Sequence, residues 1–141
     1  MMNVVASKKE LYLERSGDNL SCIFCNMEKE KIIIENEAAY AVFDIFPVSN
    51  GHMLIIPKTH IRDYFEAGQH EKQELWELVD RCKVYLDEKY QPDAYNVGIN
   101  CGEDAGQTVM HLHIHLIPRY KGDLINPRGG VRGVIPDKRI Y

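Results

Sequence analysis

Three histidines alternate with apolar residues near the end of the chain, between residues 111 and 117. Successive side chains of a β-strand point to opposite faces. An extended run would therefore place His111, His113 and His115 on one face, spaced about 6.6 Å apart. The other face would carry the apolar residues that can pack under a helix, Leu112, Ile114 and Leu116.

Two chemistries suit such a row of imidazoles. In the first, the alternating histidines ligate a metal ion. In the second, one imidazole attacks phosphorus while its neighbours orient it and move protons. Purely structural histidines are the third interpretation, but three imidazoles on one face are costly to bury unless each has a partner. We therefore predict a functional site on this strand.

The loop ahead of the histidines, residues 100–108, has the composition of an anion-binding loop. Gly102 and Gly106 would allow backbone N–H groups to approach a phosphate closely. Gln107 and Thr108 add side-chain donors beside them. Most loops with two glycines are ordinary turns, so the position directly before the histidine run is what favours a binding loop here.

Cys22 and Cys25 form a close pair, separated by two residues. In a reducing compartment such a pair indicates metal binding or redox chemistry before it indicates a structural disulfide. A redox pair is disfavoured because no helix is predicted to open after Cys25, and two free thiols are the remaining alternative. Cys82 falls on a predicted apolar helix stripe and Cys101 at the end of a predicted strand, so we expect both in the core.

One long helix and several short strands would position these residues. An apolar stripe at three- and four-residue spacing predicts a helix over residues 71–90, and Pro92 stops it. Turn residues divide the rest of the chain into short segments. We expect strands at 32–35, 40–43, 52–56, 94–101 and 111–117, the last ended by Pro118, with helical segments at 8–14 and 60–67 and an irregular tail. Short turns between strands predict an α+β domain on an antiparallel sheet.

Composition limits the possible partners. The net charge is −4 and the isoelectric point about 5.8, which argues against a nucleic-acid partner but not against a phosphorylated ligand in a local pocket. No apolar run approaches the roughly 20 residues that span a membrane, and the first ten residues do not resemble a signal peptide. We expect a cytoplasmic protein with one domain over residues 1–141.

The histidine run and its loop, Gly106-Gln107-Thr108-Val109-Met110-His111-Leu112-His113-Ile114-His115-Leu116-Ile117-Pro118-Arg119, resemble the signature of the histidine triad (HIT) superfamily. The segments 43–47 and 51–58 resemble that family's second block. The likeness covers a core of residues 22–119 in the family's order and leaves 120–141 as a C-terminal tail. It implies a HIT-like meander sheet of antiparallel strands with one long helix and short additional helices.

The resemblance implies an enzyme that binds a purine nucleotide and cleaves it at the α-phosphorus. His113 would be the nucleophile that forms a nucleotidyl-histidine, and His115 would contact the phosphate or help to protonate the leaving group. His111 belongs to the same triad, and His52 would face the same pocket from the neighbouring strand. The residues implied to bind the nucleotide are Phe43, Asp44, Ile45, Asn100, Gly106, Gln107 and Thr108, with Asp44 accepting from the ribose and Gln107 and Thr108 holding phosphate oxygens.

Cys22 and Cys25 are similar to a zinc pair found in the zinc-bearing, bacterial-type branch of this family. There the other two ligands match His60 and His111, and the set would make a closed, structural tetrahedral zinc site. In that case His111 orients His113 and does no proton work. No organic cofactor is implied.

The tail and the oligomer are also implied by the resemblance. Members are homodimers whose C-terminal segments lie near the partner's active site. Lys121, Arg128 and Arg132 are therefore candidates for substrate choice, although a solvated tail or a dimer contact explains the two arginines slightly better.

Several functions stay open at this point. The leading one is hydrolysis of a nucleoside phosphoramidate or of a dinucleoside polyphosphate such as a diadenosine polyphosphate. Its variant is a phosphorylase-type nucleotidyltransferase that passes the nucleotide to phosphate. The rivals are a non-catalytic nucleotide-binding module and a metalloenzyme with zinc on His111, His113 and His115.

Overall fold

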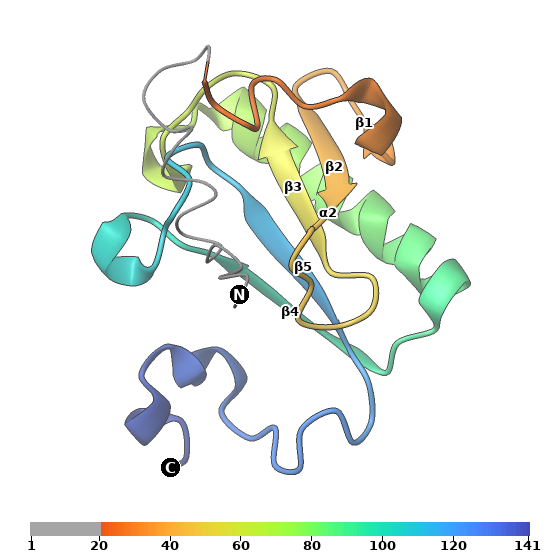
Figure 1. The fold of residues 1–141 in the computed structure, drawn as a ribbon, viewed down its shortest axis with the longest axis vertical. Coiled ribbons are helices and arrows are strands. Elements are labelled where there is room, and N and C mark those ends of the chain that lie inside the picture. Colours follow the sequence, from red (N-terminus) through yellow and green to blue (C-terminus); the bar gives the residue numbers. More distant parts are fainter. Residues whose placement is uncertain (1–20) are drawn as a thin grey trace, which may run out of the picture.

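A five-stranded antiparallel sheet with one long helix on one face forms the body of the chain (Figure 1). The computed structural model describes residues 21–141, so the helix expected at 8–14 lies outside the described part. The α+β class is therefore confirmed. The elements are η1 (Lys29–Lys31), β1 (Ile34–Glu35), β2 (Ala39–Phe43), β3 (Met53–Pro57), η2 (Tyr64–Glu66), α2 (Gln69–Tyr90), β4 (Ala94–Ile99), η3 (Glu103–Ala105), β5 (Ile114–Arg119), η4 (Gly130–Val134) and η5 (Pro136–Lys138).

The strands run in the order β1-β2-β3-β5-β4, so the histidine strand β5 lies between β3 and β4. His115 pairs with Leu54 of β3 on one side and with Gly98 of β4 on the other. Side chains from both neighbouring strands can therefore meet around His115.

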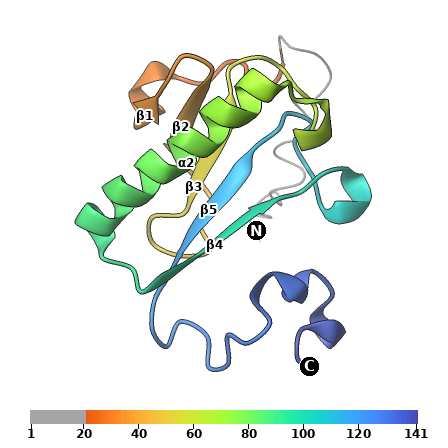
Figure 2. The ribbon, with the colours of Figure 1, turned by 180° about the vertical axis from the view of Figure 1, so that it is seen from behind.

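Helix α2 covers one face of this sheet (Figure 2). Its stripe of Leu75, Leu78, Val79, Cys82 and Leu86 is buried, as predicted. The stripe packs against Leu112, Ile114 and Leu116, which confirms the expected apolar face of the histidine run. The helix begins at Gln69 rather than at residue 71, and its C-cap Gln91 adopts the left-handed conformation (φ 53°) just before Pro92.

The opposite face of the sheet is covered by the knuckle, residues 22–25. Cys22 and Phe24 pack against Val42, Leu54 and Ile56. The Tyr40 hydroxyl donates to the backbone carbonyl of Phe24 and ties the knuckle to β2. The functional residues described below lie on this face.

Strand β5 begins at Ile114, so the expectation of a strand from residue 111 was wrong. The reason is a competing bond, because the Leu112 N–H donates to the Ile61 carbonyl at 2.7 Å and draws residues 111–113 away from β3. Pro118 does not end the strand either. Beyond Leu116, β5 pairs only with β4 in the described sheet, and proline is tolerated at such an edge.

Other boundaries also differ from the expectation. Strand β4 ends at Ile99, and Cys101 is half-buried outside the core, not inside it; Cys82 is fully buried as expected. Only Tyr64–Glu66 of the expected segment 60–67 is helical, with Asp63 as its N-cap. The tail carries the two short helices η4 and η5, where we expected irregular structure. Among the described helices, none is both long and apolar enough to cross a membrane.

Candidate active site

The knuckle, the segment after β3 and the start of the histidine run bring together four side chains that could ligate a metal ion, Cys22, Cys25, His60 and His111. Their ligand atoms all lie within 4.8 Å of one another. The Nδ1 atoms of His60 and His111 are 3.2 Å apart, and the Cys25 sulfur is 3.1 Å and 3.5 Å from them. The ligands of a tetrahedral zinc ion are separated by about 3.3–3.8 Å, given Zn–N and Zn–S bonds of about 2.0 and 2.3 Å. The four residues therefore fit zinc.

The ring of His111 is held in the orientation that ligation requires. Its Nε2 lies 2.8 Å from the Pro57 carbonyl, to which the Nε2–H donates, so Nδ1 is the unprotonated nitrogen facing the cysteines. Burial lowers the pKa of His111 to about 4, which keeps the ring neutral. Burial, with the neighbouring Cys22, raises the pKa of Cys25 to about 11, and a bound cation would reverse that effect by favouring the thiolate.

One backbone contact of His113 indicates which of its two ring nitrogens carries the proton. Its Nδ1 lies 2.9 Å from the carbonyl of His111, to which the Nδ1–H donates. In a neutral ring, Nε2 is then the nitrogen with the lone pair, which is what a nucleophile needs. The ring is 8% exposed and stands edge-on to Phe24, with a centroid distance of 5.1 Å.

His115 is part of a separate cluster with His52 and Asp44. His52 Nε2 is 2.9 Å from His115 Nδ1 and 3.6 Å from a carboxylate oxygen of Asp44. The Val48 N–H donates to His52 Nδ1, so the proton of a neutral His52 is on Nε2 and points at His115. His115 then carries its own proton on Nε2. Metal ligation by His52 Nε2 would require the proton on Nδ1, where Val48 already donates, so this cluster suits a proton relay better than a metal.

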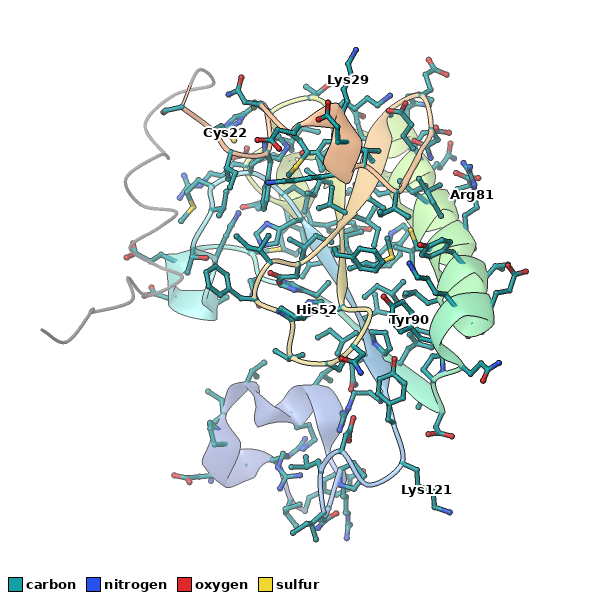
Figure 3. All side chains as sticks on the ribbon, turned by 45° about the vertical axis from the view of Figure 1, so that its right-hand side comes forward. Cys22, Lys29, His52, Arg81, Tyr90 and Lys121 are labelled. Atoms are coloured by element: carbon teal, nitrogen blue, oxygen red, sulfur yellow. The ribbon has the colours of Figure 1, made fainter. Side chains whose placement is uncertain are left out.

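The two histidine clusters lie at different places along the sheet. In Figure 3, Cys22 is near one end of the sheet and His52 is much nearer the other. His113 is between them, with its ring centroid 5.1 Å from that of His115. His113 and His115 thus line one small cavity, while His111 is turned to the cysteines.

A small cavity of about 140 Å³ opens beside His113 and His115. Three of the predicted loop residues, Asn100, Gly106 and Thr108, line it as well. Gly106 has φ +93°, a left-handed conformation that glycine adopts without strain, and this lets the loop turn back over the cavity. The remaining walls are apolar and come from Phe24, Leu54 and Val109.

Gln107 makes different contacts from those we expected. Its side chain is 2% exposed; its oxygen accepts from the Gly102 N–H at 2.8 Å. Its nitrogen donates to the carbonyls of Arg62 and Val109 at 2.7 and 3.0 Å. Its amide nitrogen thus donates to two backbone carbonyls, so Gln107 ties the binding loop to the segment at Arg62 and does not make the expected contact with phosphate oxygens available.

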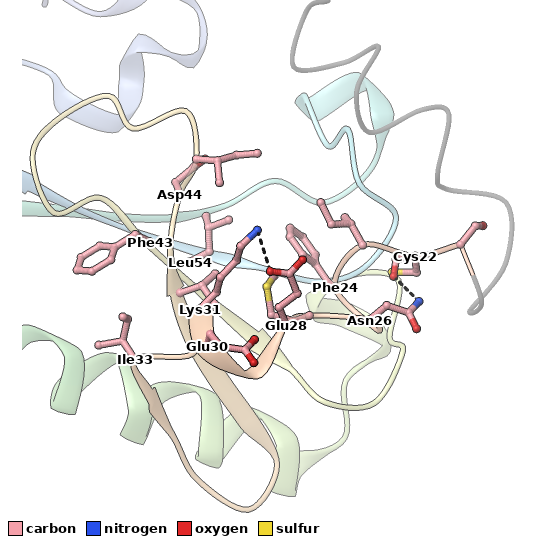
Figure 4. A pocket seen from close by; sticks show the side chains of 15 residues that line it. Cys22, Phe24, Asn26, Glu28, Glu30, Lys31, Ile33, Phe43, Asp44 and Leu54 are labelled. Carbon is pink, nitrogen blue, oxygen red and sulfur yellow. Dashed lines mark hydrogen bonds and ion pairs between the residues drawn. The ribbon is translucent and has the colours of Figure 1, made fainter.

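A larger cavity of about 730 Å³ adjoins the small one and shares Phe24 and Leu54 with it. Figure 4 shows its walls, with Asp44 towards one end, the knuckle at the other and Phe24 and Leu54 in between. Asp44 is buried, and one carboxylate oxygen accepts from the Phe46 N–H at 2.9 Å. The predicted nucleotide-binding residues Phe43, Asp44 and Ile45 all line this cavity.

Sequence reasoning missed the wall formed by Ile23, Phe24, Met27 and Leu54. The alternation of Leu54 within an apolar strand gave no sign of a cavity. The knuckle did carry a usable signal, because large apolar residues between two cysteines that are predicted to bind a metal should lie close to the segments joined by that site.

Comparison with known proteins agrees with this geometry. The family model described as the HIT domain matches residues 26–122. The protein named Protein hit of Bacillus subtilis is 38% identical over 108 residues, covering 73% of this chain and 74% of that protein. A bis(5'-adenosyl)-triphosphatase of Saccharomyces cerevisiae is 35% identical over 101 residues, covering 68% of this chain and 49% of that protein.

Solved structures show the same fold. A HIT family protein from Bacillus anthracis superposes with a TM-score of 0.68 at 36% identity, covering 72% of this chain and 75% of that one. A Zn-bound histidine triad family protein from Mycobacterium smegmatis has a TM-score of 0.69 at 32% identity, covering 77% of this chain and 82% of that one. The chain belongs to the HIT domain family, whose relatives here include a nucleotide hydrolase.

Proposed function

We propose that this chain is a nucleotide hydrolase or transferase that cleaves a purine nucleotide at the α-phosphorus through a nucleotidyl-His113 intermediate. The observation that carries the proposal is the 2.9 Å contact between His113 Nδ1 and the His111 carbonyl, from which the tautomer of His113 is assigned. Its Nδ1–H is held by the His111 carbonyl, and its ring lines a small cavity directly beside a larger one. The larger cavity has room for a nucleoside and the small one lies where its 5'-phosphate would reach.

The reaction follows from these positions in two displacements. First, Nε2 of His113 forms a bond to phosphorus as the bond to the leaving group breaks, and the leaving atom keeps the electron pair. The Thr108 hydroxyl, in the cavity wall, would donate to a phosphate oxygen as charge builds on it. Second, water, or a phosphate acceptor in a transferase, attacks phosphorus and releases His113.

The nucleoside would lie in the larger cavity. The Asp44 carboxylate, at the end of that cavity, would accept hydrogen bonds from the ribose hydroxyls, and the apolar knuckle side chains would cover the base. A nucleoside phosphoramidate and a diadenosine polyphosphate both contain a nucleoside that could bind in this way. The yeast relative that is named a bis(5'-adenosyl)-triphosphatase supports the second substrate class.

We also propose a structural zinc ion on Cys22, Cys25, His60 and His111, as in the zinc-bearing branch of the family. The geometry of the four ligands and the Zn-bound relative support it. The ion would fix the knuckle against the histidine segment, and through the His111 backbone it would fix the ring of His113. Zinc on His111, His113 and His115 is not supported, because in the described residues His111 clusters with the two cysteines and His60, whereas His115 clusters with Asp44 and His52.

A homodimer in the cytoplasm completes the proposal. Strand β4 is an edge of the described sheet, and the tail exposes large apolar side chains such as Ile125, Val134 and Tyr141. Both features are typical of a surface that another copy covers. The described cysteines, Cys22, Cys25, Cys82 and Cys101, are all free thiols, which suits a reducing compartment.

The test is a comparison of His113→Ala with the unaltered chain in zinc content and turnover. We expect the variant to keep its zinc and its melting temperature while turnover of adenosine 5'-phosphoramidate and diadenosine triphosphate falls by at least about a thousandfold. Loss of zinc together with activity would instead support the metalloenzyme. Nucleotide binding with no turnover by the unaltered chain would support the non-catalytic module.

A further inference from the structure

Charged side chains line the larger cavity at a place that neither the ribose contact nor the chemistry at phosphorus uses. Glu28 is the N-cap of helix η1, and Glu30 and Lys31 lie within that helix. All three line the cavity. In the view of Figure 4 the Lys31 ammonium and the Glu28 carboxylate, joined by a dashed line, lie between Asp44 and Asn26. The pair therefore faces the space that the proposed function gives to the nucleoside.

The backbone at this pair is fixed, while the two side chains are exposed. Met27 and Ile32, on either side of the pair, pack against the buried cluster formed by the knuckle and strands β2 and β3. The Lys31 N–H donates to the Glu28 carbonyl at 3.0 Å. The side chains of Glu28 and Lys31 are 66% and 56% exposed. They can therefore rearrange around a bound base without any change in the fold.

The ion pair itself contributes little to the free energy of unfolding. Its Nζ–Oε2 separation is 3.6 Å, and exposed lysine–carboxylate pairs are worth little in water because solvent screens them. Exchanging this contact for hydrogen bonds to a base therefore carries little cost in stability. Substitutions of Glu28 or Lys31 should accordingly leave the melting temperature nearly unchanged.

The position of the ribose decides which part of a purine meets the pair. With the ribose hydroxyls at Asp44, the base extends from that end of the cavity towards the knuckle, whose apolar side chains can cover its faces. A flat ring between apolar walls leaves its polar edge for the polar groups of the wall. Glu28 and Lys31 lie beside this stretch of the cavity, so the edge of the base meets a carboxylate and an ammonium.

Guanine complements a carboxylate beside an ammonium more fully than adenine does. Its Watson–Crick edge carries the N1–H and N2–H donors next to the O6 acceptor, whereas adenine has the N6–H donor beside the N1 acceptor. A carboxylate only accepts and an ammonium only donates. Glu28 can therefore accept two bonds from guanine while Lys31 donates to O6, whereas adenine can make one bond to each residue. Glu30 adds a further carboxylate to this wall, which also favours the edge with more donors.

We propose that Glu28, with Lys31 beside it, recognises the edge of the base and selects guanosine over adenosine nucleotides. The inference rests on the proposed function, which places a purine nucleoside in this cavity. Glu28 accepts from N1–H and N2–H of guanine, and Lys31 donates to O6. Neither residue takes part in the reaction at phosphorus, so the choice of base and the chemistry can be varied separately.

The experiment compares kcat/KM for the 5'-phosphoramidates of guanosine, inosine and adenosine. Inosine keeps O6 and N1–H of guanine but lacks the N2 amino group, so it removes one of the two bonds to Glu28. We expect guanosine to be preferred over both other substrates about tenfold, the effect of one hydrogen bond to a charged group. Inosine and adenosine should be turned over at similar rates, because each makes one bond to Glu28 and one to Lys31.

Two variants separate the roles of the pair. Glu28→Gln keeps the size of the side chain but replaces one acceptor by a donor, so the ratio of guanosine to inosine should fall to about one. Lys31→Met should raise KM severalfold for all three substrates and leave that ratio unchanged, since every base loses one bond. Glu37→Gln and Lys29→Met are the matched controls, because both residues are exposed and neither lines the cavity; they should change neither quantity.

Every other outcome contradicts a defined part of this inference. Equal kcat/KM for the three substrates, a preference for adenosine, or a guanosine preference that persists in Glu28→Gln would overturn the role of Glu28 and leave the proposed function intact. Unchanged KM values in Lys31→Met would overturn the role of Lys31. Absence of turnover with all three bases would overturn the proposed function itself. If Glu28→Gln does not fold, the ratio of guanosine to inosine in the unaltered chain decides.

Discussion

His113 and His115 are neighbours on one face, yet their hydrogen bonds prepare them for opposite tasks. The backbone carbonyl of His111 takes the Nδ1–H of His113 and leaves a lone pair on Nε2. His52 gives its own proton towards Nδ1 of His115 and so leaves a proton on His115 Nε2. One ring is prepared to attack and the other to donate.

This difference predicts how His115→Ala should behave. For a substrate whose leaving group must be protonated, such as an alkyl phosphoramidate, we expect kcat/KM to fall by about 10²–10⁴. For the p-nitrophenyl ester of AMP, whose leaving group departs without a proton, the loss should be much smaller. Steady-state kinetics with both substrates checks this, and equal losses would contradict the role of His115 as a donor.

At the residue level, alternation alone predicted much of the site. It separated the histidines from the apolar residues that pack under α2, and the resemblance indicated Asp44 and the zinc ligands. Alternation could not show that the Leu112 N–H donates to the Ile61 carbonyl. Because of this bond, β5 starts later than expected and His111 is free to face the cysteines. Alternation also could not show that the Gln107 side chain donates to the backbone carbonyls of Arg62 and Val109, because Arg62 lies 45 residues away.

At the level of elements, the knuckle is the part that the sequence underdetermined. Periodicity predicted α2 and its buried stripe because a long helix shows its pattern in its own residues. The knuckle is too short for periodicity, and its cysteines contact His60 and His111, which lie 35 and 89 residues further along the chain from Cys25 and Cys22. Only the assembled fold shows Phe24 as a wall shared by two cavities.

The knuckle leads to a prediction about zinc. Cys25→Ser should lose the bound metal and lower both the melting temperature and turnover, because the knuckle no longer holds the histidine segment. Cys101→Ser, a half-buried cysteine outside the ligand set, should keep one zinc per chain. Elemental analysis and thermal unfolding of both variants check this. Equal zinc content in the two variants would show that the knuckle does not bind the metal.

At the scale of the whole molecule, an ion pair helps to join the tail to the sheet. Arg119 at the end of β5 holds Asp123, and the Tyr120 N–H also donates to that carboxylate, at 3.0 Å. These contacts lower the pKa of Asp123 from 3.8 to about 2, with the Arg119 hydrogen bonds as the main cause. The sequence could not predict this arrangement, because the tail has no periodic pattern and its charges can pair in several ways.

The ion pair gives the attachment of the tail a defined pH dependence. Because the pKa of Asp123 is lower in the folded chain, its contribution to stability is present above about pH 4 and disappears as the pH falls through 2. An NMR titration of the side-chain carboxyl should give a midpoint near 2. In Arg119→Gln the midpoint should return towards 3.8, whereas a midpoint near 3.8 in the unaltered chain would contradict the pairing.

The proposal that His113 becomes covalently attached to the nucleotide is central, and intact-mass measurement tests it directly. The unaltered chain and His113→Gly are mixed with an adenosine phosphoramidate or diadenosine triphosphate and quenched rapidly without acid. The intact mass of each protein is then measured. We predict an adduct of one adenylyl group on the unaltered chain and none on His113→Gly. An adduct that persists in the variant, or turnover by the unaltered chain without any adduct, would contradict the account.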